Sequence, residues 1–178
     1  MRSVFLVSVL VCTLTYGMSC NRIAQEIPVN KGIAKHNMDI LYKFPAKKIP
    51  KSHEELLKGG NKCSVASVKT VDNVYYPQRK DSIFTISCIG YEIGYYFVTA
   101  ESREFVISVK LVKNMPDVFP ELIGIEAKEL KRRYGEPDAI KKGNYKYVPA
   151  SCETGDDSII FGITDDKVTS VEWEFPVD

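Results

Sequence analysis

The sequence of 178 residues has little that would support catalysis. It has only two histidines, His36 and His53, and no Gly-x-Ser-x-Gly motif, so neither a Cys–His pair nor a Ser–His–Asp triad has a local signature. No cysteines or histidines have the spacing of a zinc site. The acidic pairs at 156–157 and 165–166 are more typical of solvated turns than of a calcium site. We therefore predict a protein that is not an enzyme and that holds neither metal nor cofactor.

The sequence also lacks an excess of charge of either sign. It has 24 basic and 23 acidic residues, and residues 1–20 contain one arginine and no acidic residue. A nucleic-acid-binding protein needs a basic stripe, which a balanced composition does not supply. We predict no nucleic-acid partner.

No apolar run is long enough to span a membrane as a helix. The longest, residues 4–14, is well short of the ~20 residues that a bilayer requires, and with Arg2 before it the run is typical of a signal peptide. Cys20, three residues after Gly17, resembles the acylated cysteine of a bacterial lipoprotein signal, although that family prefers leucine where Gly17 stands. The resemblance implies that residues 1–19 are removed, that a fatty acid such as palmitate is attached at Cys20, and that the protein is anchored in the outer membrane. Ordinary cleavage after Gly17 is the alternative.

Three cysteines are then left for the folded part: Cys63, Cys88 and Cys152. An exported protein can form disulfides, and three thiols permit one bridge. Cys88 is predicted on a buried strand face with Phe84 and Ile86, where a free thiol behaves as a small apolar residue. Cys63 and Cys152 lie near loop ends, so we predict a disulfide between them.

Residues 20–51 have three prolines, scattered lysines and no sustained hydrophobic period. This composition predicts a tether, with a short extended piece at 38–44; a strand added to the edge of a sheet is the alternative. Ser52 and Glu55 then form a capping box that predicts a short helix at 53–58. We place the folded domain at 52–178.

Alternating apolar and polar residues predict four strands in the first half of this domain, at 63–71, 82–89, 91–99 and 105–113. In the last of them Phe105, Ile107, Val109 and Leu111 are predicted to share one face. Period-two alternation with polar residues between favours an antiparallel sheet that is covered on one side.

The last third of the chain is predicted as one helix followed by three strands. The helix, at 125–134, ends at Gly135, and Pro137 prevents it from resuming. The strands lie at 145–148, 158–164 and 168–175, with a tight hairpin between the last two. We expect Leu130 to pack on the sheet that carries Phe161 and Trp173. The predicted fold class is α+β: an antiparallel sheet with one or two short helices packed on one face.

The spacing of several residues in this region resembles that of the small outer-membrane lipoproteins of the SmpA/OmlA type. The residues that carry the resemblance are Gly124, Ile125, Leu130, Tyr134, Gly135, Pro137, Tyr145, Tyr147 and the hairpin that follows. Those lipoproteins belong to the β-barrel assembly machinery and share a fold with the β-lactamase inhibitor proteins. Because the chain is longer than one such module, the resemblance suggests two degenerate helix-plus-meander modules, the first beginning at 53–58. It implies shape only, since fold does not determine function.

Tyrosines are the best candidates for a binding surface, because interfaces favour aromatic residues. The candidates are Tyr91, Tyr95, Tyr96, Tyr145 and Tyr147, and packing into the core is the alternative for most of them. The predicted function is that of a non-enzymatic cell-envelope lipoprotein that reaches the membrane through its anchor and binds another envelope protein through a sheet face or edge. The alternative is a small-ligand-binding or inhibitor protein that uses a concave sheet face.

Overall fold

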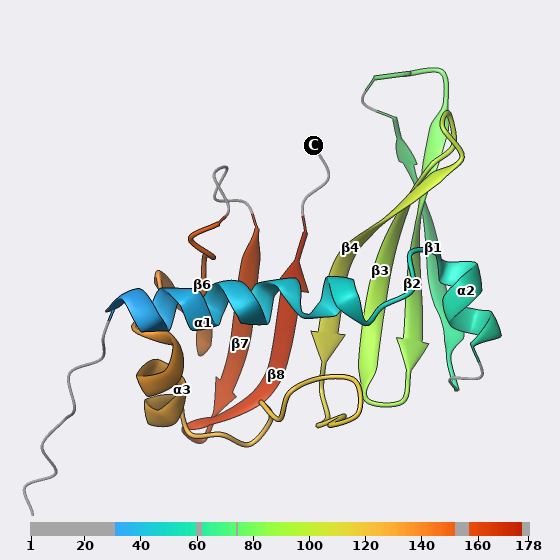
Figure 1. The fold of residues 1–178 in the computed structure, drawn as a ribbon. Helices are drawn as coiled ribbons and strands as arrows, with labels where there is room; N and C mark the ends of the chain where they lie inside the picture. The colour runs from blue at the N-terminus through green and yellow to red at the C-terminus, as the bar shows by residue number, and fades with distance from the viewer. Residues whose placement is uncertain (1–30, 60–61, 74, 152–156, 176–178) are drawn as a thin grey trace, which may run out of the picture.

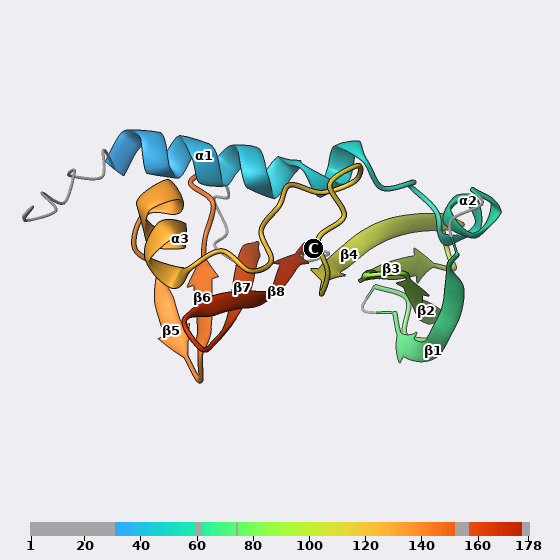
Figure 2. The same ribbon diagram turned by 90° about the horizontal axis from the view of Figure 1, so that it is seen from below.

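A computed structural model describes residues 31–59, 62–73, 75–151 and 157–175. These residues form an eight-stranded antiparallel sheet in the order β1-β2-β3-β4-β8-β7-β6-β5, with helices on one face (Figures 1 and 2). The strands are β1 (Ser64–Asp72), β2 (Lys80–Cys88), β3 (Tyr91–Val98), β4 (Arg103–Leu111), β5 (Ala139–Lys141), β6 (Asn144–Tyr147), β7 (Ser158–Thr164) and β8 (Lys167–Glu174). The helical elements are α1 (Lys31–Lys43), the 3-10 turn η1 (Pro45–Lys47), α2 (His53–Lys58) and α3 (Ala127–Tyr134). The predicted α+β class is confirmed.

The predicted strands and helices of the domain begin and end within two residues of the observed ones. The capping box is present, since Ser52 Oγ accepts a hydrogen bond from the Glu55 N–H (3.2 Å). Gly135 ends α3 at φ +85°, a conformation that glycine adopts without strain. Among the described elements after Ser52, the three-residue strand β5 is the one that was not predicted.

The chain repeats one arrangement twice, a helix followed by a four-stranded meander. In both meanders a glycine of the third strand lies opposite a serine of the fourth: Gly94 faces Ser108, and Gly162 faces Ser170. A side chain at either glycine would collide with that serine, and a shift in register follows each glycine. This shared detail supports two degenerate modules, which meet where β4 pairs antiparallel with β8.

Helix α1 corrects the predicted tether from Lys31 onward, including the extended piece at 38–44. Ala34, Met38 and Leu41 are buried and follow one another at spacings of four and three, which places them on one stripe of the helix. The stripe faces the sheet, and the Leu41 carbonyl accepts a hydrogen bond from Trp173 Nε1 (3.1 Å). The folded domain therefore begins before Ser52.

The core lies between the helices and the covered face of the sheet. Leu130, Phe161 and Trp173 are fully buried in one cluster, which confirms the predicted packing of α3. Tyr134 on the same helix stacks on Phe161, with ring centroids 6.2 Å apart, and Trp173 stacks on Phe119 at 5.7 Å.

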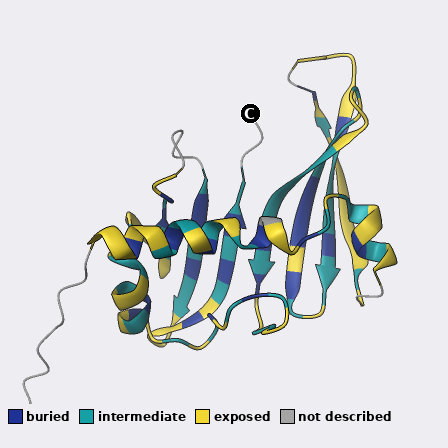
Figure 3. Cartoon of the chain, viewed as in Figure 1, coloured by how far each residue is buried: buried dark blue, intermediate teal, exposed yellow. Residues whose placement is uncertain are grey.

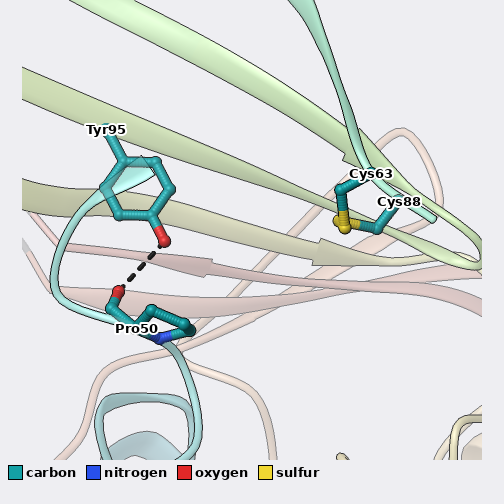
Figure 4. The surroundings of a disulfide bond; sticks show 4 residues. All are labelled: Pro50, Cys63, Cys88 and Tyr95. Carbon is teal, nitrogen blue, oxygen red and sulfur yellow. Dashed lines mark hydrogen bonds between the residues drawn. A yellow bond between two sulfur atoms is a disulfide. The ribbon is translucent and has the colours of Figure 1, made fainter. Parts of the chain in front are cut away.

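The disulfide joins Cys63 to Cys88, not to Cys152 (Figure 4). Ser64 at the start of β1 pairs with Ser87 near the end of β2, so the residues one step further along, Cys63 and Cys88, also lie opposite each other. Their Cα atoms are 4.1 Å apart. The prediction of a free, apolar Cys88 is therefore wrong as well. Cys152 lies outside the described residues.

Candidate interaction surface

The face of the sheet that the helices leave uncovered is the candidate site, and we call it the open face. Residues directly opposite one another on antiparallel strands point to the same side, so the strand register identifies its members. They form three rows: Ser87, Glu92, Lys110, Glu172, Ile160 and Lys146; Thr85, Gly94, Ser108, Glu174 and Ser158; and Ile83, Tyr96 and Phe105. Most of these residues are half-buried (Figure 3) although no described helix lies over them. The outer strands β1 and β5 bend away from α1, which makes the open face concave (Figure 2).

Three of the five predicted binding tyrosines lie instead in the core, under the helices. Tyr91, Tyr95 and Tyr147 are all buried. The Tyr95 hydroxyl donates to the Pro50 carbonyl (3.0 Å; Figure 4), and the Tyr147 hydroxyl donates to the Gly135 carbonyl (3.1 Å). The prediction that these three tyrosines belong to a binding surface is therefore wrong.

The other two tyrosines lie on opposite faces. Tyr145 is opposite Phe161 on the covered side and is half-buried, with Lys131 Nζ 5.6 Å from the centre of its ring. Tyr96 is opposite Ile83 and belongs to the open face. Of the predicted set, only Tyr96 contributes to the candidate surface.

Tyr96 is held in place by Asp81, a fully buried residue that the sequence analysis missed. The Asp81 carboxylate accepts hydrogen bonds from Tyr96 Oη (2.6 Å), the Thr99 N–H (2.9 Å) and Asn73 Nδ2 (2.8 Å). Burial by itself would raise the pKa of Asp81, but these three hydrogen bonds outweigh it and the pKa is lowered. The hydrogen bond to Asp81, together with burial, raises the pKa of Tyr96 to about 12. Asn73 also shapes the β1–β2 loop, because its Oδ1 accepts from the Tyr76 N–H (2.7 Å).

A signal for this network is present in the sequence. Asparagine favours turns in which its side chain accepts from backbone amides two or three residues ahead, and Asn73 precedes a proline-containing loop. The role of Asp81 depends on the β2–β3 register, which no local pattern indicates.

The row of Ile83, Tyr96 and Phe105 makes one end of the open face apolar. A register shift after Gly94 pairs Tyr95 with Val106 and Tyr96 with Phe105. Phe105 therefore points away from Val109, and the prediction that the two share a face is wrong. The extra residue of a β-bulge inverts the alternation beyond it. The Arg103 guanidinium lies 4.4 Å above the Phe105 ring.

Charged residues of alternating sign occupy the middle of the open face. Lys110 on β4 lies between Glu92 on β3 and Glu172 on β8. Burial raises the pKa of Glu172; Lys110 opposes the rise, and the neighbouring carboxylates of Glu174 and Glu92 add to it. A protein surface that binds here would have to supply complementary charges to this row.

A cavity of about 270 Å³ lies beyond the charged row, at the β5 edge. Its walls include the side chains of Lys141, Lys142, Lys146 and Asn144. Lysine is the commonest residue type in its lining, which also includes Ala139 and Ile160, so an anion with an apolar part is a candidate ligand.

The described residues contain no group of three or more His, Cys, Asp or Glu side chains that would hold a metal ion. His53 is fixed at the start of α2: its backbone N–H donates to Glu104 Oε2 (2.8 Å), its Nδ1 contacts the same carboxylate, and its ring stacks on Phe84 at 4.1 Å. These contacts fasten α2 to the sheet.

Within the described ranges, no helix is both long and apolar enough to cross a membrane. The predicted signal peptide and Cys20 lie outside those ranges. Comparisons of the chain with protein-family models, with curated proteins and with solved structures found no match.

Proposed function

We propose that this protein is a non-enzymatic cell-envelope lipoprotein that binds another envelope protein through the open face. The supporting observation is a concave sheet face with an apolar end at Ile83, Tyr96 and Phe105 beside the charged row of Glu92, Lys110 and Glu172. Protein interfaces combine an apolar, aromatic core with a polar rim.

Cross-linking from the open face tests this proposal. A photoreactive amino acid at Thr85, in the middle row, would report on a bound partner, and the same amino acid at exposed Lys128 on α3 is the matched control. We expect irradiation of intact cells to yield one discrete adduct from position 85 and none from position 128. Adding Phe105→Glu should abolish that adduct, because it places a charge in the apolar row. Absence of an adduct at 85, or the same adducts at both positions, would contradict the proposal.

The disulfide supports the export part of the proposal, since such bonds persist mainly in oxidising compartments. Anchoring through Cys20 is tested by Cys20→Ser. The variant should appear in the soluble fraction after lysis, whereas the wild type stays with the membranes. A variant that sediments with the membranes would show that thiol acylation is not the anchor.

The lysine-lined cavity favours a second candidate, a small anionic ligand bound at the β5 end of the concave face. Pyrophosphate is a suitable probe, because its charges match the three lysines. Binding would raise the melting temperature of the wild type, and Lys146→Gln would reduce the shift. An equal shift in both proteins would place the anion elsewhere.

A further inference from the structure

The loop between β1 and β2, residues 73–79, carries two adjacent exposed tyrosines, and we call it the tyrosine loop; residue 74 lies outside the described residues. The exposed fractions of Tyr75 and Tyr76 are 74% and 53%. Within the described ranges, neither phenol ring has a hydrogen-bonding or stacking partner. A hairpin can close with two residues, so this loop is longer than the turn requires. Its length and its exposed rings need a reason other than closing the hairpin.

The backbone of the tyrosine loop is held from both sides. Asn73 Oδ1 accepts hydrogen bonds from the Tyr75 N–H (2.9 Å) and the Tyr76 N–H (2.7 Å). The Arg79 N–H donates to the Tyr76 carbonyl (2.8 Å), and the Asn73 N–H donates to the Arg79 carbonyl (3.3 Å). Because these bonds fix the positions from which the two rings extend, a partner that buries the rings loses less entropy in ordering the loop.

The tyrosine loop begins beside the apolar row of the open face. Asp81 is two residues before Ile83 on β2, so it lies on the open face, and it is fully buried although no described helix covers that face. Asn73 of the loop and Tyr96 of the apolar row both donate to its carboxylate. The loop extends past the ends of the strands (Figure 1) and lies on the concave side of the sheet (Figure 2). A protein bound over the apolar row is therefore within reach of the loop.

The charges at this end of the sheet indicate the chemistry of such a partner. Lys80 pairs with Asp72, and Arg103 lies 4.0 Å from Glu101. Exposed Arg79 has no acidic group within 4 Å among the described residues. Tyrosine and arginine, with tryptophan, are the residue types that contribute most to the affinity of protein interfaces. The loop offers two aromatic rings to an apolar side chain and one cation to a carboxylate.

We propose that the tyrosine loop anchors the partner of the open face, and that the partner buries Tyr75 and Tyr76 with a segment that carries an apolar side chain next to a carboxylate. This inference rests on the proposed function and names the residues on which its affinity depends. A membrane is the competing occupant, because tyrosines also favour the headgroup region of a bilayer. A protein can contact the loop and the apolar row together, whereas a flat bilayer that touched the loop would leave the concave row uncovered.

Photo-cross-linking from the loop tests this inference separately from the proposed function. A photoreactive phenylalanine derivative at position 76 keeps an aromatic ring there. Irradiation of intact cells should give an adduct of the same mass as that from position 85, since one partner contacts both. The same amino acid at Ile140, a residue 57% exposed on β5, should give none.

The outcomes separate the two proposals. An adduct at position 85 together with no adduct at 76, a different protein at 76, or lipid at 76 would overturn this inference and leave the proposed function standing. Absence of an adduct at 85 would refute both.

Truncation of the two rings measures their contribution. In the protein with the photoreactive group at position 85, Tyr75→Ala combined with Tyr76→Ala should lower the adduct yield by about tenfold or more. Arg79→Glu should also lower it, because the partner's carboxylate would then be repelled. Ile140→Ala is the matched control: it removes a similarly exposed apolar side chain, and the yield should not change.

The melting temperatures of these variants should equal that of the wild type, because every substituted side chain is exposed. An unchanged yield in the tyrosine variant or in Arg79→Glu would overturn the inference. Should the tyrosine variant fail to fold, the adduct from position 76 decides the question.

Discussion

Two neighbouring residues of α1 should respond very differently to truncation. Leu41 is 4% exposed and Ile40 is 54% exposed. Leu41→Ala removes three buried carbon atoms and leaves a cavity between α1 and the sheet, so we expect the free energy of unfolding to fall by about 2–5 kcal/mol. Ile40→Ala removes atoms that are mostly in water already, and its effect should stay within about 0.5 kcal/mol.

Urea unfolding followed by fluorescence measures this difference. Trp173 is the only tryptophan, is fully buried and bonds to the Leu41 carbonyl, so its emission reports on this contact. With a denaturant slope of about 2 kcal/mol/M, Leu41→Ala should lower the midpoint by roughly 1–2.5 M, and Ile40→Ala should leave it almost unchanged. Equal midpoints for the two variants would refute the packing of α1 on the sheet and would restore the interpretation of residues 31–43 as a tether.

Two further predictions concern the hydrogen-bond network and the disulfide. The pKa of Tyr96 is about 12 in the folded protein and about 10 when unfolded, so the unfolded chain loses this proton first and stability falls between pH 10 and pH 12. At pH 11 this loss should reach at most about 1 kcal/mol relative to pH 9, because solvent screens a partly exposed group, and the loss measured for Tyr96→Phe should be smaller by that amount; equal losses would show that Tyr96 does not titrate in this way. The bond between Cys63 and Cys88 closes a loop with a sequence separation of 25 residues, so Cys88→Ser should lower the free energy of unfolding by about 3.5 kcal/mol. Reductant should lower the urea midpoint of the wild type to that of Cys88→Ser and leave the midpoint of the variant unchanged. A wild-type midpoint that does not respond to reductant would contradict the disulfide.

Sequence reasoning succeeded where a local pattern determines the structure. Apart from the short β5, the strands of both meanders show period-two alternation, and α3 has a glycine stop, so their bounds could be predicted. Helix α1 also carried a signal, the spacing of Ala34, Met38 and Leu41. That stripe is narrow, and lysines and nearby prolines surround it, so the segment was interpreted as irregular.

Features that depend on strand register could not be predicted in the same way. The bulge after Gly94 adds one residue to β4 and moves Phe105 to the open face. The hydrogen bond between Asp81 on β2 and Tyr96 on β3 likewise depends on the register in which the two strands pair. The disulfide could have been predicted, because Cys63 lies at the start of one predicted strand and Cys88 near the end of the next. A hairpin places these two ends side by side. It was missed because the cysteines were assigned by their nearness to loops.

The size of the open face follows from the way the two modules meet. Equivalent last strands, β4 and β8, pair antiparallel, so the modules are related by an approximate two-fold rotation normal to the sheet. Such a rotation keeps the described helices of both modules on one side, so none of them covers the opposite side of the sheet. The segment from α1 to Pro50 secures this arrangement from the covered side: Asn37 Nδ2 donates to the Arg133 carbonyl (3.2 Å) in the second module, and the Pro50 carbonyl accepts from Tyr95 (3.0 Å) in the first. The described part of the segment predicted to be a tether therefore connects the two halves of the sheet on the covered side, opposite the face at which we propose that a partner binds.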